Sequence, residues 1–220
     1  MGTMTETLRL LQLCSPALPV GAFAYSEGLE TVAGAPGFDA AGWITGRLRR
    51  GPARLDAPVA ARLVQAWRAG DTHAVDHWNA LLFALREARE LREADRYLGQ
   101  ALARLLLSLG IESAAAWRQR EDATFAALFA LAAARWDLAT DAALAGLLYL
   151  WLEGQVAAAV KLVPLGQTAG QKLLFAAAGE IPALVAAALA MDDDDIGALA
   201  PGAAIAAARH ETLEVRLFRS

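Results

Sequence analysis

Apolar residues recur at intervals of three and four along almost the whole chain, and this spacing is typical of helices. The clearest case is a run of six apolar residues that fall on one helical face: Leu91, Ala94, Leu98, Leu102, Leu105 and Leu109. We find no run of the alternating type, rich in β-branched residues, that a half-buried strand requires. The pattern therefore predicts an all-α protein.

Capping residues and helix breakers divide this pattern into about ten helices. Thr3 and Glu6 fit a capping box that opens a first helix, which is expected to end near Cys14. Asp39 and Asp56 are expected to cap two later helices, which end before glycines. A second helix is predicted to end near residue 34, and the segment 71–109 is predicted to be helical with a break in the middle. Further helices are predicted at 122–134, 140–163, from 167, 182–191 and after 201.

The chain shows no internal repeat and no linker long enough to separate two domains. Residues 1–220 are therefore predicted to form a single domain, a helical bundle.

A run of alternating charges, Arg86 to Glu93, interrupts the apolar pattern. On a helix Arg86 would pair with Glu90 and Arg89 with Glu93, and each such pair contributes about 0.2–0.5 kcal/mol. We interpret the run as a helix surface that faces solvent; a surface that faces a partner is the alternative.

Composition and charge exclude several classes of protein. The chain has 220 residues, of which 56% are hydrophobic, so it can bury a core and is not disordered. Its net charge of −4 argues against a nucleic-acid-binding protein. A single cysteine cannot form a disulfide within the chain.

Two observations lead us to expect a cytoplasmic protein that does not cross a membrane. The longest strictly apolar stretches, 142–152 and 196–208, are shorter than the roughly 18 residues of a membrane span. Residues 1–13 also lack the order of basic, apolar and small-residue regions that marks a signal peptide.

We expect no catalytic residue and no resident cofactor. The serines lie outside any Gly-x-Ser-x-Gly context. The segment 166–172 has only three residues between its glycines, and neither Ser nor Thr follows its lysine, so it is not a phosphate-binding loop. Cys14 is either a nucleophile or a buried thiol, and its apolar surroundings favour the buried thiol.

We also expect no stable metal site. His73 and His77 lie one helical turn apart with Asp76 between them, but two imidazoles make only a transient metal contact. The four consecutive acids at 192–195 are typical of a solvated loop, because a calcium site needs spaced ligands.

Two segments are candidates for binding. Glu153 and Lys161 lie on one face of the long apolar helix, where unpaired burial of charge would be costly. Either Lys161 extends to solvent from the helix end, or this face meets a partner or a water-filled passage. The last eleven residues, 210–220, contain Leu213, Leu217 and Phe218; a frayed end is usual, but these side chains favour a tail ordered by docking.

Three ordered blocks of the sequence resemble the UreF family of urease accessory proteins. They are residues 10–30 (LLQLCSPALPVGAFAYSEGLE), 149–171 (YLWLEGQVAAAVKLVPLGQTAGQ) and 208–220 (ARHETLEVRLFRS), and the charged run 87–95 is a weaker fourth. The chain departs from the family pattern at four positions, Cys14, Ala24, Glu27 and Gly154, where Ala, Ser, Gln and a larger polar residue are typical.

The resemblance implies a non-enzymatic chaperone for urease maturation. Such proteins are all-helical homodimers that bind the accessory protein UreD, also called UreH, and the GTPase UreG. This assembly engages apo-urease and assists nickel insertion into its active site. Nickel would pass transiently as cargo and would not be a resident cofactor.

The resemblance also implies two faces. The candidates for the face towards the GTPase are Glu30, Glu153 and Lys161, and those for the face towards UreD are Arg209, His210, Arg216, Leu217 and Phe218. Two alternatives stay open: a GTPase-activating protein that supplies an arginine finger to UreG, and a helical hydrolase that uses Cys14 or a metal at His73 and His77.

Overall fold

A computed structural model describes residues 3–198 and 200–220, and within them the regular secondary structure is helical, without a strand. This confirms the all-α prediction. The α-helices are α1 (Met4–Leu13), α2 (Leu29–Ala33), α3 (Ala40–Arg50), α4 (Asp56–Ala69), α5 (Thr72–Ala84), α6 (Arg89–Ser108), α7 (Phe125–Arg135), α8 (Thr140–Leu162), α9 (Gln167–Ala178), α10 (Ile181–Leu189) and α11 (Pro201–His210). Short 3₁₀ helices are η1 (Ala22–Ala24), η2 (Glu112–Trp117) and η3 (Asp193–Asp195).

Local capping sets most of these boundaries as expected. The Thr3 hydroxyl accepts a hydrogen bond from the Glu6 amide at 3.2 Å, and Asp39 accepts one from Gly42 at 3.0 Å, so both predicted caps are confirmed. The predicted cap at Asp56 is wrong. Leu55 occupies that position, and Asp56 is the first helical residue, whose carboxylate is used by an ion pair.

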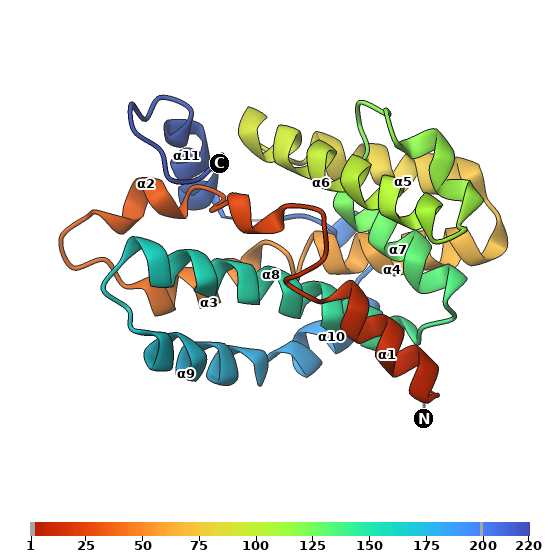
Figure 1. Cartoon of the computed structure of the whole chain (residues 1–220), viewed down its shortest axis with the longest axis horizontal. Helices are drawn as coiled ribbons and strands as arrows, with labels where there is room; N and C mark the ends of the chain where they lie inside the picture. Colours follow the sequence, from red (N-terminus) through yellow and green to blue (C-terminus); the bar gives the residue numbers. More distant parts are fainter. Residues whose placement is uncertain (1–2, 199) are drawn as a thin grey trace.

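The core forms where α4, α7 and α8 meet. Helix α7 is apolar all round, and every residue from 126 to 133 is buried, as expected of a helix with no polar face. It packs on α4 and α6, while α8 runs through the molecule and contacts α3, α4, α9 and α10 (Figure 1). The fold is thus a single bundle around a central long helix.

Two segments are long and apolar enough to cross a membrane by length and composition alone. One is α8, in which 56% of the most apolar window is buried, as in the core helix of a bundle. The other, Gln167–Leu189, has 28% of its window buried and consists of α9 and α10, which are separated by a turn at residues 179–180. These two helices lie along one edge of the bundle (Figure 1), where Phe175 is 85% exposed.

The end of the chain returns to its beginning. Helix α11 packs against α2 and α6, and the chain end lies close to α2 (Figure 1). Gly28 makes this approach feasible, because a Cβ there would lie 2.6 Å from the backbone nitrogen of Ala207. Its φ of +83° is also a conformation that favours glycine.

Candidate functional site

The tail after α11 is docked on the body of its own chain. The carbonyl oxygen of Ser220 accepts hydrogen bonds from the amides of Ser26 and Glu27, and the Arg219 amide donates to Ala24 at 2.8 Å. The Ser26 hydroxyl adds a further bond to Ser220, at 2.7 Å. The loop between α1 and α2 therefore holds the end of the tail.

A buried histidine lies at the start of the tail. His210 is fully buried, with Nδ1 2.7 Å from Glu90 and Nε2 2.9 Å from Glu30. Arg216 donates to the other oxygen of Glu90 at 2.7 Å. The cluster therefore brings together α2, α6, α11 and the tail.

Glu30, a candidate for the face towards the GTPase, lies beneath the tail. Its carboxylate accepts hydrogen bonds from the amides of Leu217 and Phe218, at 2.6 and 3.0 Å. Burial alone would raise the pKa of Glu30, but these bonds and the one from His210 outweigh it, so the pKa lies below its ordinary value.

The remaining tail candidates divide into a buried group and an exposed group. Phe218 is 5% exposed, and the Nζ of Lys161 lies 5.5 Å from the centre of its ring. Arg209 and Leu217 are exposed, and so is Val215. The structure thus brings Glu30 and Lys161 from one expected face into contact with the tail of the other.

Glu153 lies away from this cluster, on the α8 face that the sequence singled out. It lines a cavity of about 80 Å³ between α8 and the loop that precedes η1, and Lys161 borders the same cavity. Burial raises the pKa of Glu153, and no described cation lies close enough to offset this. This face of α8 therefore presents a carboxylate without a partner in the described part of the chain.

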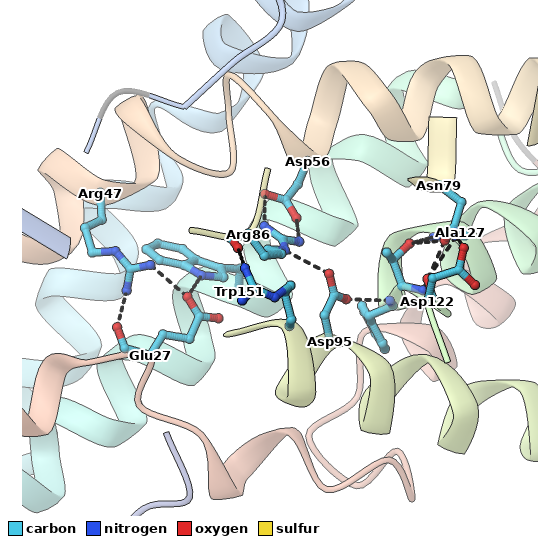
Figure 2. Close-up of polar contacts among 12 residues, drawn as sticks. Glu27, Arg47, Asp56, Asn79, Arg86, Asp95, Asp122, Ala127 and Trp151 are labelled. Carbon is cyan, nitrogen blue, oxygen red and sulfur yellow. Dashed lines mark hydrogen bonds and ion pairs between the residues drawn. The ribbon is translucent and has the colours of Figure 1, made fainter. Parts of the chain in front are cut away.

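The interpretation of the charged run as solvent-facing is wrong for Arg86 and Glu90, which both pair with charged groups inside the protein. Arg86 does not pair with Glu90; its guanidinium lies between Asp56 and Asp95, with Nε 2.8 Å from Asp95 (Figure 2). Burial opposes the charge of Arg86, but the two carboxylates outweigh it and raise its pKa further. Of the two expected pairs only Arg89–Glu93 forms, at 3.5 Å on the surface.

A cavity of about 180 Å³, larger than the one beside Glu153, lies next to Arg86. Its wall includes Glu27, which accepts hydrogen bonds from Arg47 and from the indole of Trp151, at 2.9 and 3.0 Å (Figure 2). Apolar side chains of α6 and α8, such as Leu98 and Leu147, complete it. Five charged groups of the wall pair with one another: Glu27 with Arg47, and Arg86 with Asp56 and Asp95.

The residues that the rival enzyme hypothesis needs are placed unfavourably. Burial raises the pKa of the Cys14 thiol to about 12, so the reactive thiolate is scarce at neutral pH. His73 and His77 are exposed on α5, and Asp76 is bound by Arg120. Within residues 3–198 and 200–220, no group of three or more His, Cys, Asp or Glu is arranged to hold a metal ion.

Comparison with known proteins decides the family. The family model UreF matches residues 38–178. A urease accessory protein UreF of Alkalilimnicola ehrlichii is 47% identical over 216 residues, 96% of this chain and 95% of the relative.

The chain belongs to the UreF family.

Other UreF proteins agree over nearly the same length. That of Hahella chejuensis is 45% identical and covers 97% of both chains, and that of Pseudomonas putida is 46% identical over the whole of both. These relatives are urease accessory proteins, which implies a role for this chain in urease maturation. The alignment with the Pseudomonas putida protein covers the whole chain, so it includes the loop before α2 and the tail, both of which lie outside the family model.

Sequence reasoning missed Glu90 and Arg86 as parts of these clusters. Neither has a signal in its neighbours, because their partners lie far along the chain: Glu90 binds His210, 120 residues away, and Arg86 binds Asp56, 30 residues away. A mixed charged run has the same appearance whether its residues meet solvent or distant counter-ions. Only the tertiary structure distinguishes the two cases: α6 packs against α11, and the segment just before α6 meets Asp56 of α4.

Proposed function

We propose that this UreF-family chain is a scaffold that, with a UreD/UreH-type accessory protein, recruits the GTPase UreG to apo-urease and assists nickel insertion. The observation that carries the proposal is membership of the family of urease accessory proteins over nearly the whole chain. The docked tail supports the proposal, because it exposes the apolar side chains of Val215 and Leu217, and exposed apolar surface is typical of sites that bind proteins.

The tail is the face that we propose for the UreD-type partner. Arg209 and Leu217 are exposed and available for contact, together with the outer side of Arg216. His210 and Phe218 are buried, so they contribute by holding the tail in place.

The α8 face is the one that we propose for the GTPase. Lys161 is exposed at the end of α8, and Glu153 borders the same small cavity two turns earlier. Glu30, the third candidate, is covered by the tail, and its oxygens are occupied by His210, Leu217 and Phe218, so it would act indirectly, by holding the tail beside this face. The two partner faces would therefore be adjacent.

The chain would act through its surfaces, without an active site of its own. Nickel is cargo in this scheme, carried by the GTPase and released during its nucleotide cycle, and this chain would touch it transiently at most. A scaffold couples that cycle to metal release only if it binds two GTPase states with different affinity. We further propose a cytoplasmic homodimer.

Co-purification is the direct test of the scaffold. We expect a tagged chain to bring down a UreD-type and a UreG-type protein together, and cells without it to make nickel-poor urease. Failure to capture either partner would refute the proposal. Measuring GTP turnover with and without the chain separates a scaffold from a GTPase activator, which would raise the rate.

Lys161→Ala tests the face towards the GTPase. We expect weaker capture of UreG by the accessory-protein pair, because a charge at the end of α8 is lost. Lys172→Ala on α9 is the matched control, since Lys172 is the other lysine of the chain and is also exposed. Equal capture by both variants would remove Lys161 from the face.

A further inference from the structure

The cavity of about 180 Å³ beside Arg86 has an excess of negative charge in its wall. The wall contains more carboxylates than guanidinium groups: the carboxylates are those of Glu27, Asp56, Glu87 and Asp95, and the guanidinium groups are those of Arg47 and Arg86. The two oxygens of Asp95 accept hydrogen bonds from the Phe125 amide and from Arg86, and both bonds favour its ionised form. The cavity is therefore suited to a positively charged ligand.

Glu87 is the charged group of this wall that has no counter-ion in the described part of the chain. The other charged groups pair among themselves, as Figure 2 shows. Glu87 is exposed, and so is Leu85 beside it in the wall, so the cavity is open to solvent here. Its carboxylate is therefore accessible to a cation that enters from solution.

A buried acceptor without a partner also belongs to the wall. Gln155 is 2% exposed, and its side-chain nitrogen donates to the carbonyl oxygen of Ser26 at 3.4 Å. This bond determines which end of the amide is the oxygen, and that oxygen, Oε1, has no hydrogen-bond partner among the described residues. An unpaired buried acceptor is costly, and an N–H group of a ligand would satisfy it.

Apolar side chains form much of the remaining wall. Leu91 and Leu98 come from α6, and Leu147 and Trp151 come from α8. Gly154 in α8 adds space, because a Cβ there would meet nothing within 4 Å. Apolar walls around charge of one sign strengthen the field that acts on a bound ion of opposite sign.

The size of the cavity and its donor set narrow the class of ligand. Pockets for drug-sized ligands have about 300–1,000 Å³, so this smaller cavity is suited to a group of a few carbon atoms. A calcium ion, for comparison, takes about 6–8 oxygen ligands. Within residues 3–198 and 200–220, no three His, Cys, Asp or Glu are arranged to hold a metal ion. An organic cation instead fills apolar space and donates N–H groups to unpaired oxygens.

We propose that this cavity binds a small organic cation, an alkyl chain of a few carbons that ends in a guanidinium or ammonium group. The alkyl chain packs on the leucines of α6 and α8, and the N–H groups meet the free oxygens that Glu87 and Gln155 supply. A free small molecule and the arginine or lysine side chain of a protein partner both carry this chemistry. The site is a property of the isolated chain, so it does not depend on the proposed function.

NMR titration of the ¹⁵N-labelled full-length chain with butylguanidinium tests the site. We expect saturable shifts of the Trp151 indole N–H and of the Gln155 side-chain amide, since both residues line the cavity. Butylurea has nearly the same shape without the charge and should bind at least about tenfold more weakly. Guanidinium without the alkyl chain should also bind at least about tenfold more weakly, because it lacks the apolar contacts.

Two variants with matched controls locate the site. Gly154→Leu fills the cavity from α8 and should weaken binding of butylguanidinium at least about tenfold. Gly46→Leu in α3 is its control, because Gly46 lies outside this wall and a Cβ there would approach only the end of the Arg50 side chain, at 3.8 Å. Glu87→Gln should weaken binding about twofold to fivefold. Glu112→Gln makes the same change on the exposed surface of η2 and should have no effect.

Three outcomes would overturn the site. They are the absence of saturable shifts at Trp151, equal affinity for butylguanidinium and butylurea, and wild-type affinity in a folded Gly154→Leu chain. If Gly154→Leu does not fold, Glu87→Gln decides, because wild-type affinity in that variant would show that the charge of the wall is not recognised.

A competition experiment distinguishes the two sources of the cation. If an excess of butylguanidinium, but not of butylurea, reduces capture of a UreD-type or UreG-type protein, the site receives a side chain of that partner. Unchanged capture assigns the site to a free small molecule. Failure to capture either partner without any competitor would refute the proposed function, while the titration would still decide the cavity.

Discussion

At the scale of single residues, Arg86 shows how a charge comes to be buried. Its side chain is 19% exposed and lies between Asp56 on α4 and Asp95 on α6. Asp95 also accepts a hydrogen bond from the amide of Phe125 at 2.6 Å, so the pair reaches the start of α7. One guanidinium thus connects three helices of the core.

Arg86→Met should therefore destabilise the fold strongly. Removing one partner of a buried ion pair leaves uncompensated charge and typically costs about 3–5 kcal/mol. Arg89→Met, at the exposed start of α6 three residues later, is the control and should change stability by less than about 0.5 kcal/mol. Urea unfolding followed by circular dichroism measures both, and similar midpoints for the two variants would contradict the role of Arg86.

The docking of the tail should depend on pH through Glu30. Its pKa is lower in the folded chain than its ordinary value of 4.5, so it stabilises the docked tail above that value. The stabilisation is lost as the pH falls through the lower, folded value. His210 faces Glu30 from α11, and Glu90 and Arg216 complete the cluster from α6 and the tail.

Protection factors of the Leu217 and Phe218 amides measure this dependence. We expect protection at pH 7 and its loss in acid in the wild-type chain. Glu30→Gln should be poorly protected at both pH values. Acid-resistant protection in the wild type would show that Glu30 does not hold the tail.

At the scale of elements, glycines show where two helices approach closely. A Cβ at Gly99 in α6 would lie 2.9 Å from the backbone of Ala123 and Thr124, at the start of α7. A Cβ at Gly154 in α8 would meet nothing within 4 Å. The two positions share a helical backbone and differ only in their neighbours.

This difference predicts opposite effects of the same substitution. Gly154→Ala should stabilise the chain by about 0.5–1 kcal/mol, because alanine loses less backbone entropy in a helix. Gly99→Ala should destabilise it by about 1–3 kcal/mol, because α6 must move away from α7. Thermal unfolding of the two variants is the measurement, and a stabilising Gly99→Ala would refute the close contact.

Element boundaries were predictable where they depend on neighbours in the chain. Thr3 and Asp39 cap their helices with hydrogen bonds that span three residues, and the predicted long helix 140–163 agrees with α8 to within one residue. The exceptions are informative. Helix α7 begins at Phe125 and not at Asp122, because Asp122 is bound by Asn79 and Arg120 from outside the segment.

At the scale of the whole molecule, the tail contributes stability although it follows the last helix. In the described part of the chain the α-helices lie within residues 4–210, so the tail adds contacts and not α-helix. Phe218 is its main buried side chain, and full burial of a phenylalanine contributes roughly 1.5–3 kcal/mol.

Deletion of residues 211–220 should therefore leave helical content nearly unchanged but lower the melting temperature by about 4–8 °C. The same deletion should abolish binding to a UreD-type partner. Phe218→Ala in the full chain should reproduce much of the thermal effect. An unchanged melting temperature after deletion would mean that the tail is not docked in solution.

The sequence by itself determined the helical class, most helix limits and the family resemblance. These depend on residue spacing, on caps a few residues apart and on ordered blocks such as 149–171. Only the tertiary structure decided what the charged groups do. Glu90 meets His210 and Arg86 meets Asp56 because segments that are distant in the sequence pack together. The sequence shows that such groups are charged, but burial and distance determine which opposite charge each one meets.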